Sequence, residues 1–172
     1  MNVEGDAMRE ETHEFIESRE EMEKVLAGSE LGFLGLVDGD GCYVVPMNYS
    51  YHGDGRILFH CALEGKKLDC IRAHPNVSFT VARQAESVRP HAQDDTCHID
   101  SDSVICTGVA RIIEDLDERA EALNRFNRAY RPKADDVPAD QVKNCGVVEI
   151  TLTEMTGRRE RERKRTLWRW RF

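Results

Sequence analysis

Two adjacent lysines, Lys66 and Lys67, are the side chains whose type and position most clearly suggest chemistry. They follow Gly65 at the start of a segment predicted to be a helix, which Pro75 ends. The free amides in the first turn of a helix and the ammonium groups of lysines both attract anions. The pair therefore predicts an anion site, for which phosphate is the natural occupant. The alternative is a solvated lysine pair, because phosphate sites outside fixed motifs are weak signals.

Two predicted strands precede this helix. Residues 43–51 are rich in β-branched and aromatic residues, residues 53–55 form a Gly-Asp-Gly turn, and residues 56–62 form the second strand. Pro46 has no backbone N–H to donate, so it belongs at a sheet edge or at a break in pairing. The backbone groups freed near Pro46 can then face a planar polar ligand.

The order of these segments resembles that in a known family. The run VVPMNYSY, a turn and the run ILFHCALEGKKLDCIRAHPNVSFTV are similar to the pyridoxamine 5′-phosphate oxidase-like flavin-binding split barrels, in the branch related to nitroimidazole-resistance proteins. A further match is Ser103-Val104, followed by Gly108-Val109-Ala110-Arg111. The resemblance extends from about residue 19 to residue 157. It implies a mainly β (α+β) fold, a split β-barrel of about six strands with peripheral helices.

The resemblance also implies a flavin mononucleotide (FMN) site shared between the two subunits of a homodimer. The lysines would hold the phosphate, the strand end before them would line the ribityl chain, and the earlier strand would run beside the ring. The candidate cofactor-binding residues are Val45, Pro46, Met47, Asn48, Tyr49, His60, Cys61, Ala62, Lys66, Lys67, Ser103 and Val104. His60 is the candidate catalytic residue, because its side chain can move a proton near neutral pH; alternatively, it only satisfies a strand end or the phosphate.

The implied function is an FMN-dependent oxidoreductase that reduces nitroaromatic compounds of the 5-nitroimidazole type or other small electrophiles. A haem-binding or haem-handling split barrel and a non-catalytic flavin carrier are the alternatives. Two departures from the family pattern bear on the substrate. Asp100 and Asp102 stand where relatives commonly carry an aromatic or basic residue, and the basic Arg/Trp tail at residues 158–172 lies outside the matching region.

Composition limits the remaining possibilities. With 172 residues, 40% of them hydrophobic, the chain suits a single domain, 1–172, with an acidic N-terminal extension at 1–17. The net charge of −8 argues against a nucleic-acid partner. No apolar run approaches the roughly 20 residues that cross a bilayer, and the acidic N-terminus is unlike a secretion signal, so we expect a cytoplasmic protein with no membrane partner. The six cysteines include no CxxC pair, so we expect free thiols and no metal site.

The other elements follow from periodicity and capping. We expect a helix at 18–28 opened by a capping box from Ser18 to Glu21, and strands at 77–83, 103–114 and 148–153, with Glu149 on the solvent side of the last. Gly108 marks a bulge or a close approach. A second long helix is expected after an Asp117 cap. Its residues Ala120, Leu123, Phe126 and Tyr130 would face the core.

Three further segments carry expectations. The apolar run at 31–37 needs cover on both faces, as in a closed barrel or under a partner subunit, and therefore favours a dimer. The long polar segment at 84–102 suggests a lid, a binding loop or local disorder. The acidic N-terminus and the basic C-terminus are expected to be solvated and able to pair, and residues 168–172 suggest a short terminal strand.

Overall fold

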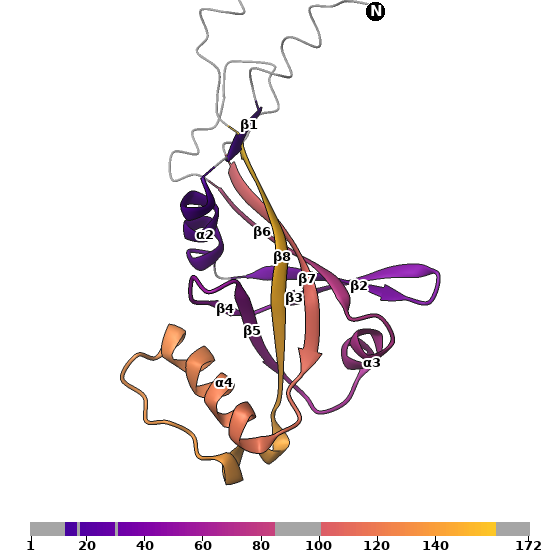
Figure 1. Ribbon diagram of the computed structural model, residues 1–172, viewed down its shortest axis with the longest axis vertical. Helices are drawn as coiled ribbons and strands as arrows, with labels where there is room; N and C mark the ends of the chain where they lie inside the picture. The colour runs from indigo at the N-terminus through magenta and orange to yellow at the C-terminus, as the bar shows by residue number, and fades with distance from the viewer. Residues whose placement is uncertain (1–12, 17, 30, 85–100, 161–172) are drawn as a thin grey trace, which may run out of the picture.

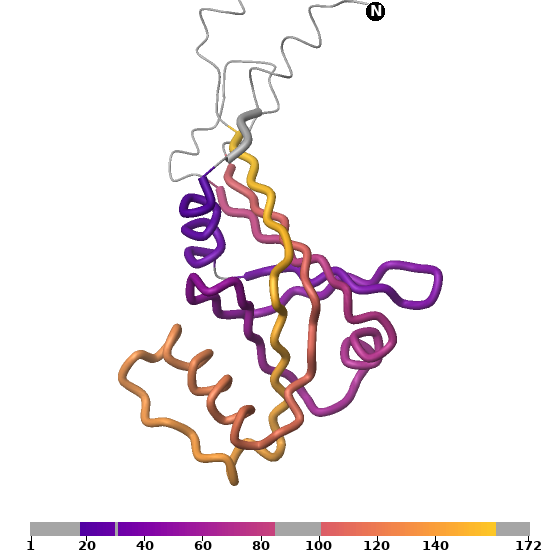
Figure 2. The backbone as a smooth tube through the Cα atoms, in the orientation of Figure 1, coloured from indigo at the N-terminus to yellow at the C-terminus, as the bar shows by residue number. Residues whose placement is uncertain are grey.

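The computed structural model describes residues 13–16, 18–29, 31–84 and 101–160. Strands dominate this part of the chain, and a few helices lie around them (Figures 1 and 2). The strands are β1 (His13–Ile16), β2 (Gly32–Asp38), β3 (Gly41–Met47), β4 (Ser50–Tyr51), β5 (Arg56–Cys61), β6 (Asn76–Gln84), β7 (Ser101–Ile112) and β8 (Gly146–Glu160). The helices are α2 (Arg19–Ala27), α3 (Lys66–Ala73), α4 (Leu116–Tyr130) and the 3-10 helix η1 (Ala139–Asn144).

All strands belong to one antiparallel sheet. Its order is β3-β2-β6-β7-β8-β5-β4, and β1 adds to the far end of β8. Among the described residues no ladder joins β3 to β4, so the sheet wraps around a core without closing. The predicted mainly β split barrel is confirmed, and the described part of the chain has eight strands in place of about six. The extra strands are β1, which was not predicted, and β4, which arises because the predicted strand at 43–51 breaks after Met47.

The barrel interior is apolar. Every second residue of the long strands points inward, and Leu34, Phe79, Val81, Val104 and Ile150 are fully buried there. Helices α2 and α3 add their apolar faces to the same cluster. A second, smaller cluster lies under α4. One face of the sheet therefore packs against the core, and helices α2, α3 and α4 contribute apolar residues to the two clusters.

Helix α4 begins two residues earlier than predicted. Asp115 is its N-cap and accepts hydrogen bonds from the backbone N–H groups of Asp117 and Glu118 at 3.1 and 2.9 Å. Asp117 as the cap was therefore wrong: it lies in the first turn, beside the positive end of the helix dipole. Ala120, Leu123 and Phe126 are buried as expected, whereas Tyr130 is exposed at the end of the helix.

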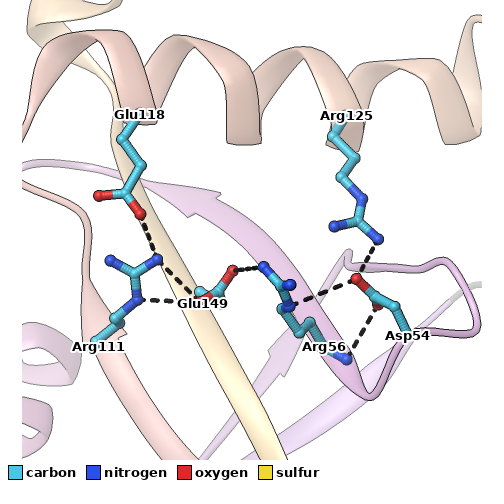
Figure 3. Close-up of polar contacts among 6 residues, drawn as sticks. All are labelled: Asp54, Arg56, Arg111, Glu118, Arg125 and Glu149. Carbon is cyan, nitrogen blue, oxygen red and sulfur yellow. Dashed lines mark hydrogen bonds and ion pairs between the residues drawn. The ribbon is translucent and has the colours of Figure 1, made fainter.

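Strand β8 is much longer than predicted, and Glu149 is buried on it, so a solvent-facing Glu149 was wrong. The reason is that α4 covers the face that alternation assigned to water. Glu149 lies 3.0 Å from Arg111 and 3.5 Å from Arg56. Figure 3 shows these pairs continuing to Glu118 and Arg125 of α4 through Arg111 and Asp54. This charge chain, Glu118–Arg111–Glu149–Arg56–Asp54–Arg125, fastens α4 to the sheet.

The predicted contact between the acidic and basic ends is present. Strand β1 pairs with residues 157–160 of β8, and Arg159 contacts Glu21 of α2 at 3.3 Å. The segment at 85–100 and the tail at 161–172 lie outside the described residues, and with them the expected binding loop, Asp100 and the terminal strand. None of the helices in the described part is long and apolar enough to span a membrane.

Candidate functional site

Lys67 is the charged residue at the centre of the candidate site. Its side chain is half-buried, its Nζ lies 3.4 Å from Sδ of Met47, and the same Nζ lies 5.3 Å from the ring centroid of Phe59. Met47 ends β3, at one end of the sheet order, and Phe59 belongs to β5, the next-to-last strand at the other end, so Lys67 contacts both sides of the opening in the barrel. Within the described part of the chain no carboxylate pairs with this ammonium group. A half-buried cation without an acid partner is suited to an anionic ligand.

Lys66 lies in different surroundings although it is the next residue. Its Nζ is 2.5 Å from Oδ2 of Asp38 and 4.8 Å from the ring centroid of Tyr43. The hydrogen bond and charge of Asp38 raise the pKa of Lys66. Asp38 ends β2 at the turn into β3, and Asp-Gly-Asp-Gly at residues 38–41 is typical of such a turn. The Asp-Gly-Asp-Gly sequence gave no sign that the hairpin reaches α3.

The start of α3 is open. Its N-cap is Gly65, which has φ of 129° and offers no side-chain hydrogen bond, whereas Ser18 and Asp115 cap α2 and α4. A side chain at residue 65 would be strained at this φ. Lys66 and Lys67 occupy the first turn, where the dipole and the first amides favour an anion. The predicted helix with the two lysines in its first turn is confirmed.

The segment at 45–49 runs along the edge of the sheet. Pro46 of β3 is opposite Phe33 of β2, and among the described residues β3 pairs with no other strand, so the predicted edge position of Pro46 is confirmed. Asn48 and Tyr49 lie in the gap between β3 and β4. The Tyr49 hydroxyl donates to the Leu26 carbonyl, and the Tyr130 hydroxyl donates to the Tyr49 carbonyl at 2.5 Å. The helices on either side thus hold this backbone in place.

The strand end at 60–62 is divided between two faces. Cys61 is on the side of Phe59 and Lys67; burial raises the pKa of its thiol and the Lys67 cation opposes that shift. The ring of His60 instead packs edge-on against Phe126 of α4, 4.9 Å between centroids. Successive side chains of a strand point to opposite faces. His60 is exposed on the α4 side of β5 and is not brought together with Lys67.

Ser103 and Val104 are separated from β3 within one chain. They lie on β7, and β2 and β6 stand between the two strands. At the usual spacing of about 4.8 Å, three steps across the sheet give roughly 14 Å. Val104 is buried in the core, and Ser103 points to the outer face. Their neighbour Asp102 is buried between Arg83 and Arg159, so its acidic side chain serves an internal ion cluster.

The outer face of the sheet carries an apolar patch. Phe33, Val37, Val44, Ile105 and Val109 are all exposed, with Val44 at 57% and Ile105 at 48%. Cross-strand pairing puts Thr80 of β6 between Phe33 of β2 and Ile105 of β7, so the five residues share one face of the sheet, with polar residues of β6 between them. We call these five residues the outer apolar face. The strand at 31–37 was expected to be covered on both faces, but the described part of this chain leaves its outer face exposed.

A shallow groove lies on the same side of the sheet, and Val37 is the residue of the outer apolar face that lines it. Its volume is about 460 Å³, and its floor includes Gly35 and Gly108, with Ser78, Thr107 and Thr153 along it. Gly108 is at the register shift between β7 and β8, where a Cβ would lie 2.5 Å from the carbonyl oxygen of Thr151. The predicted bulge and close approach at Gly108 are both confirmed.

Comparison with known proteins identifies the class to which this fold and site belong. Residues 18–159 match the family model described as pyridoxamine 5′-phosphate oxidase, which covers most of the chain. The chain therefore belongs to the pyridoxamine 5′-phosphate oxidase family. The family predicted from the sequence is confirmed.

Individual relatives support the same assignment. A proposed 5-nitroimidazole antibiotic resistance protein from Bacteroides thetaiotaomicron is 27% identical, with a TM-score of 0.74 over 87% of this chain and 91% of that one. An FAD-binding protein from Mycobacterium smegmatis is 26% identical, with a TM-score of 0.57 over 87% and 99% of the two chains. The uncharacterised protein RA0666 of Rhizobium meliloti is 34% identical over 70 residues, 41% of this chain and 45% of that relative. The chain thus matches less than half the length of this curated relative.

Proposed function

We propose that the protein is a flavin-dependent oxidoreductase that binds FMN. The family assignment and the flavin-binding relative of known structure support a flavin. The observation that carries the proposal for the mononucleotide is Lys67, a half-buried ammonium group at an uncapped helix start with no described acid partner. The residues present fit a terminal phosphate at this position. The chain also has no GxGxxG fingerprint for a dinucleotide.

The protein groups in the proposed site bind and orient the cofactor. Lys67 would hold the phosphate, Cys61 and Ala62 would line the ribityl chain, and the backbone from Val45 to Tyr49 would run beside the ring. When bound, FMN supplies the hydride or electron transfer. The hydrogen bond from Tyr130 to the Tyr49 carbonyl keeps that backbone in one conformation, so that its polar groups are fixed before the ligand arrives.

The proposed substrates are nitroaromatic compounds or other small electrophiles. The relative from Bacteroides thetaiotaomicron supports this class through its description as a proposed 5-nitroimidazole resistance protein. We propose His60 as a proton donor to a substrate bound on the α4 side of β5; its ring is exposed there, on the opposite face of the strand from Cys61 and Lys67. His60→Gln should then lower turnover while leaving flavin affinity unchanged. A loss of flavin affinity would instead assign His60 to binding.

We also propose a homodimer in which a second copy covers the outer apolar face. Isolated exposed apolar residues are ordinary, but five large ones on one face of a sheet favour an interaction surface. The roughly 14 Å between β3 and Ser103 also supports a shared site, because Ser103 can reach a flavin more directly from another subunit. This face is the proposed route by which Ser103 contributes, whereas the side chain of Val104 is buried in the core.

The absorbance spectrum of the purified protein tests the cofactor. We expect a yellow protein with flavin bands, from which heat releases a compound with the mass of FMN. Release of FAD would retain the flavin proposal and reject the mononucleotide. A Soret band would indicate haem, and a colourless protein that cannot be reconstituted with FMN would reject the proposed function. Anaerobic reduction of the bound flavin, followed by reoxidation with 5-nitroimidazole, would separate an oxidoreductase from a flavin carrier.

A further inference from the structure

The ion pair between Lys66 and Asp38 places a carboxylate at the proposed phosphate site. Asp38 comes from the β2–β3 turn, and its Oδ2 lies 2.5 Å from Nζ of Lys66. Both side chains are partly exposed, 43% for Asp38 and 56% for Lys66, so the pair can open without unfolding the chain. A carboxylate and a phosphate offer the same kind of oxygen to an ammonium group. The two anions are therefore alternatives at Lys66.

We propose that Asp38 is a specificity-determining residue that competes with the flavin phosphate for Lys66. This inference rests on the proposed function, because it assumes that the phosphate binds at the start of α3. Asp38 occupies Lys66 until a phosphate displaces it. Lys67 has no described acid partner, so in the proposed site it binds the phosphate without first losing another anion. Lys67 is thus available to the phosphate at all times, whereas Lys66 must first lose its contact with Asp38.

The competition has a direction that can be measured. Removing the Asp38 charge frees Lys66 and also removes a negative charge near the incoming dianion, so FMN should bind more tightly. Exposed ion pairs contribute little, which limits the gain to roughly two- to fivefold in Kd. The gain should shrink as salt is added, because screening weakens exposed charge interactions. Riboflavin lacks the phosphate and should not respond.

Asp40 provides a matched control in the same turn. It is exposed, it carries the same charge two residues away, and the described structure contains no contact between it and Lys66. Asp38→Asn and Asp40→Asn therefore change the net charge of the protein equally. Only Asp38→Asn releases Lys66. The double variant with Asp38→Asn and Lys66→Ala tests whether the gain in FMN affinity depends on Lys66.

The experiment titrates the apo-protein and its variants with FMN and with riboflavin at low salt, with flavin fluorescence as the signal. We expect Asp38→Asn to tighten FMN binding two- to fivefold, Asp40→Asn to have little effect, and most of the gain to disappear in the Lys66→Ala background. Equal gains for the two aspartates would overturn the proposal in favour of a general charge effect. If Asp38→Asn leaves the FMN affinity unchanged while Lys67→Ala weakens it, competition by Asp38 is rejected and the phosphate site at the start of α3 is retained. A parent that binds FMN and riboflavin equally would reject the phosphate site itself, and the competition with it.

Discussion

Lys66 and Lys67 are consecutive residues whose ammonium groups lie in unlike surroundings, one against the Asp38 carboxylate at 2.5 Å and the other 3.4 Å from the Met47 thioether. From the sequence alone, the two lysines are equivalent candidates for binding the phosphate. In the structure, a phosphate at Lys66 must replace the Asp38 carboxylate. A phosphate at Lys67 replaces no described carboxylate and would be its first anionic partner. Their contributions to flavin affinity should therefore differ.

Lys67→Ala should weaken FMN binding on the order of tenfold or somewhat more, because a charge-assisted hydrogen bond contributes about 1.5–3 kcal/mol. Lys66→Ala should cost less, since it removes a cation that Asp38 already neutralises. Calorimetric titration of the two apo-variants with FMN checks the order of the effects. Riboflavin should bind both variants and the parent almost equally. Parental FMN affinity in the Lys66/Lys67 double Ala variant would show that the phosphate lies elsewhere.

The outer apolar face should control the oligomeric state. Replacing Ile105 with Asp puts a charge within the proposed interface, and burying an unpaired charge is strongly unfavourable. We expect the variant to be monomeric at micromolar concentration in light scattering, while the parent is dimeric. Ala27→Asp adds the same charge to an exposed position of α2 and should leave the dimer intact. A monomeric parent that still holds flavin would contradict both the dimer and the shared site.

Gly108 should tolerate no side chain. A Cβ there would approach the Thr151 carbonyl oxygen to 2.5 Å and Cγ2 of Ile150 to 2.8 Å, and the backbone atom cannot give way cheaply. Gly108→Ala should lower the free energy of unfolding by about 1–3 kcal/mol or more, as overpacked sites do. Gly35→Ala is the matched variant, because its Cβ would meet Ser78 only at ordinary contact distances of 3.5–3.6 Å. Urea unfolding of both variants is the measurement, and an equal response would indicate that the bulge relaxes freely.

Much of the fold could be predicted because its signals are local. Alternation in β6, β7 and β8, the capping serine of α2 and the edge position of Pro46 each depend on a few neighbouring residues. Alternation could also have shown that His60 and Cys61 point to opposite faces of β5. The candidate phosphate site was found for the same reason, since Gly65 and the two lysines form one short segment.

What the sequence did not reveal depends on contacts between distant segments. Glu149 reads as a solvent-facing residue until α4 covers it and two arginines surround it. Asp38 reads as a turn residue until the hairpin meets α3, which is 28 positions away at Lys66. Asp102 reads as a departure in the substrate site until Arg83 and Arg159 enclose it. In each case the missing information was the partner of a charge.

Tyr51 should make the stability of the protein depend on alkaline pH. Its hydroxyl donates to Oε1 of Glu23 at 2.7 Å, and burial, followed by that carboxylate, raises the pKa of Tyr51 to about 12. A tyrosine in the unfolded chain has a pKa of about 10. Because the folded pKa is the higher one, the stabilising contribution is complete below pH 10 and is lost as the pH rises toward about 12.

Tyr51→Phe removes the titrating group and isolates this contribution. The parent should be more stable than the variant by about 1–2 kcal/mol at pH 7–9, since the hydroxyl donates to a charged acceptor. The difference should narrow between pH 10 and about 12, because only the parent must keep a proton that the unfolded chain releases. Urea unfolding of both proteins at pH 8, 10 and 11 gives the two curves. Parallel curves across this range would mean that Tyr51 does not hold its proton through Glu23 and burial.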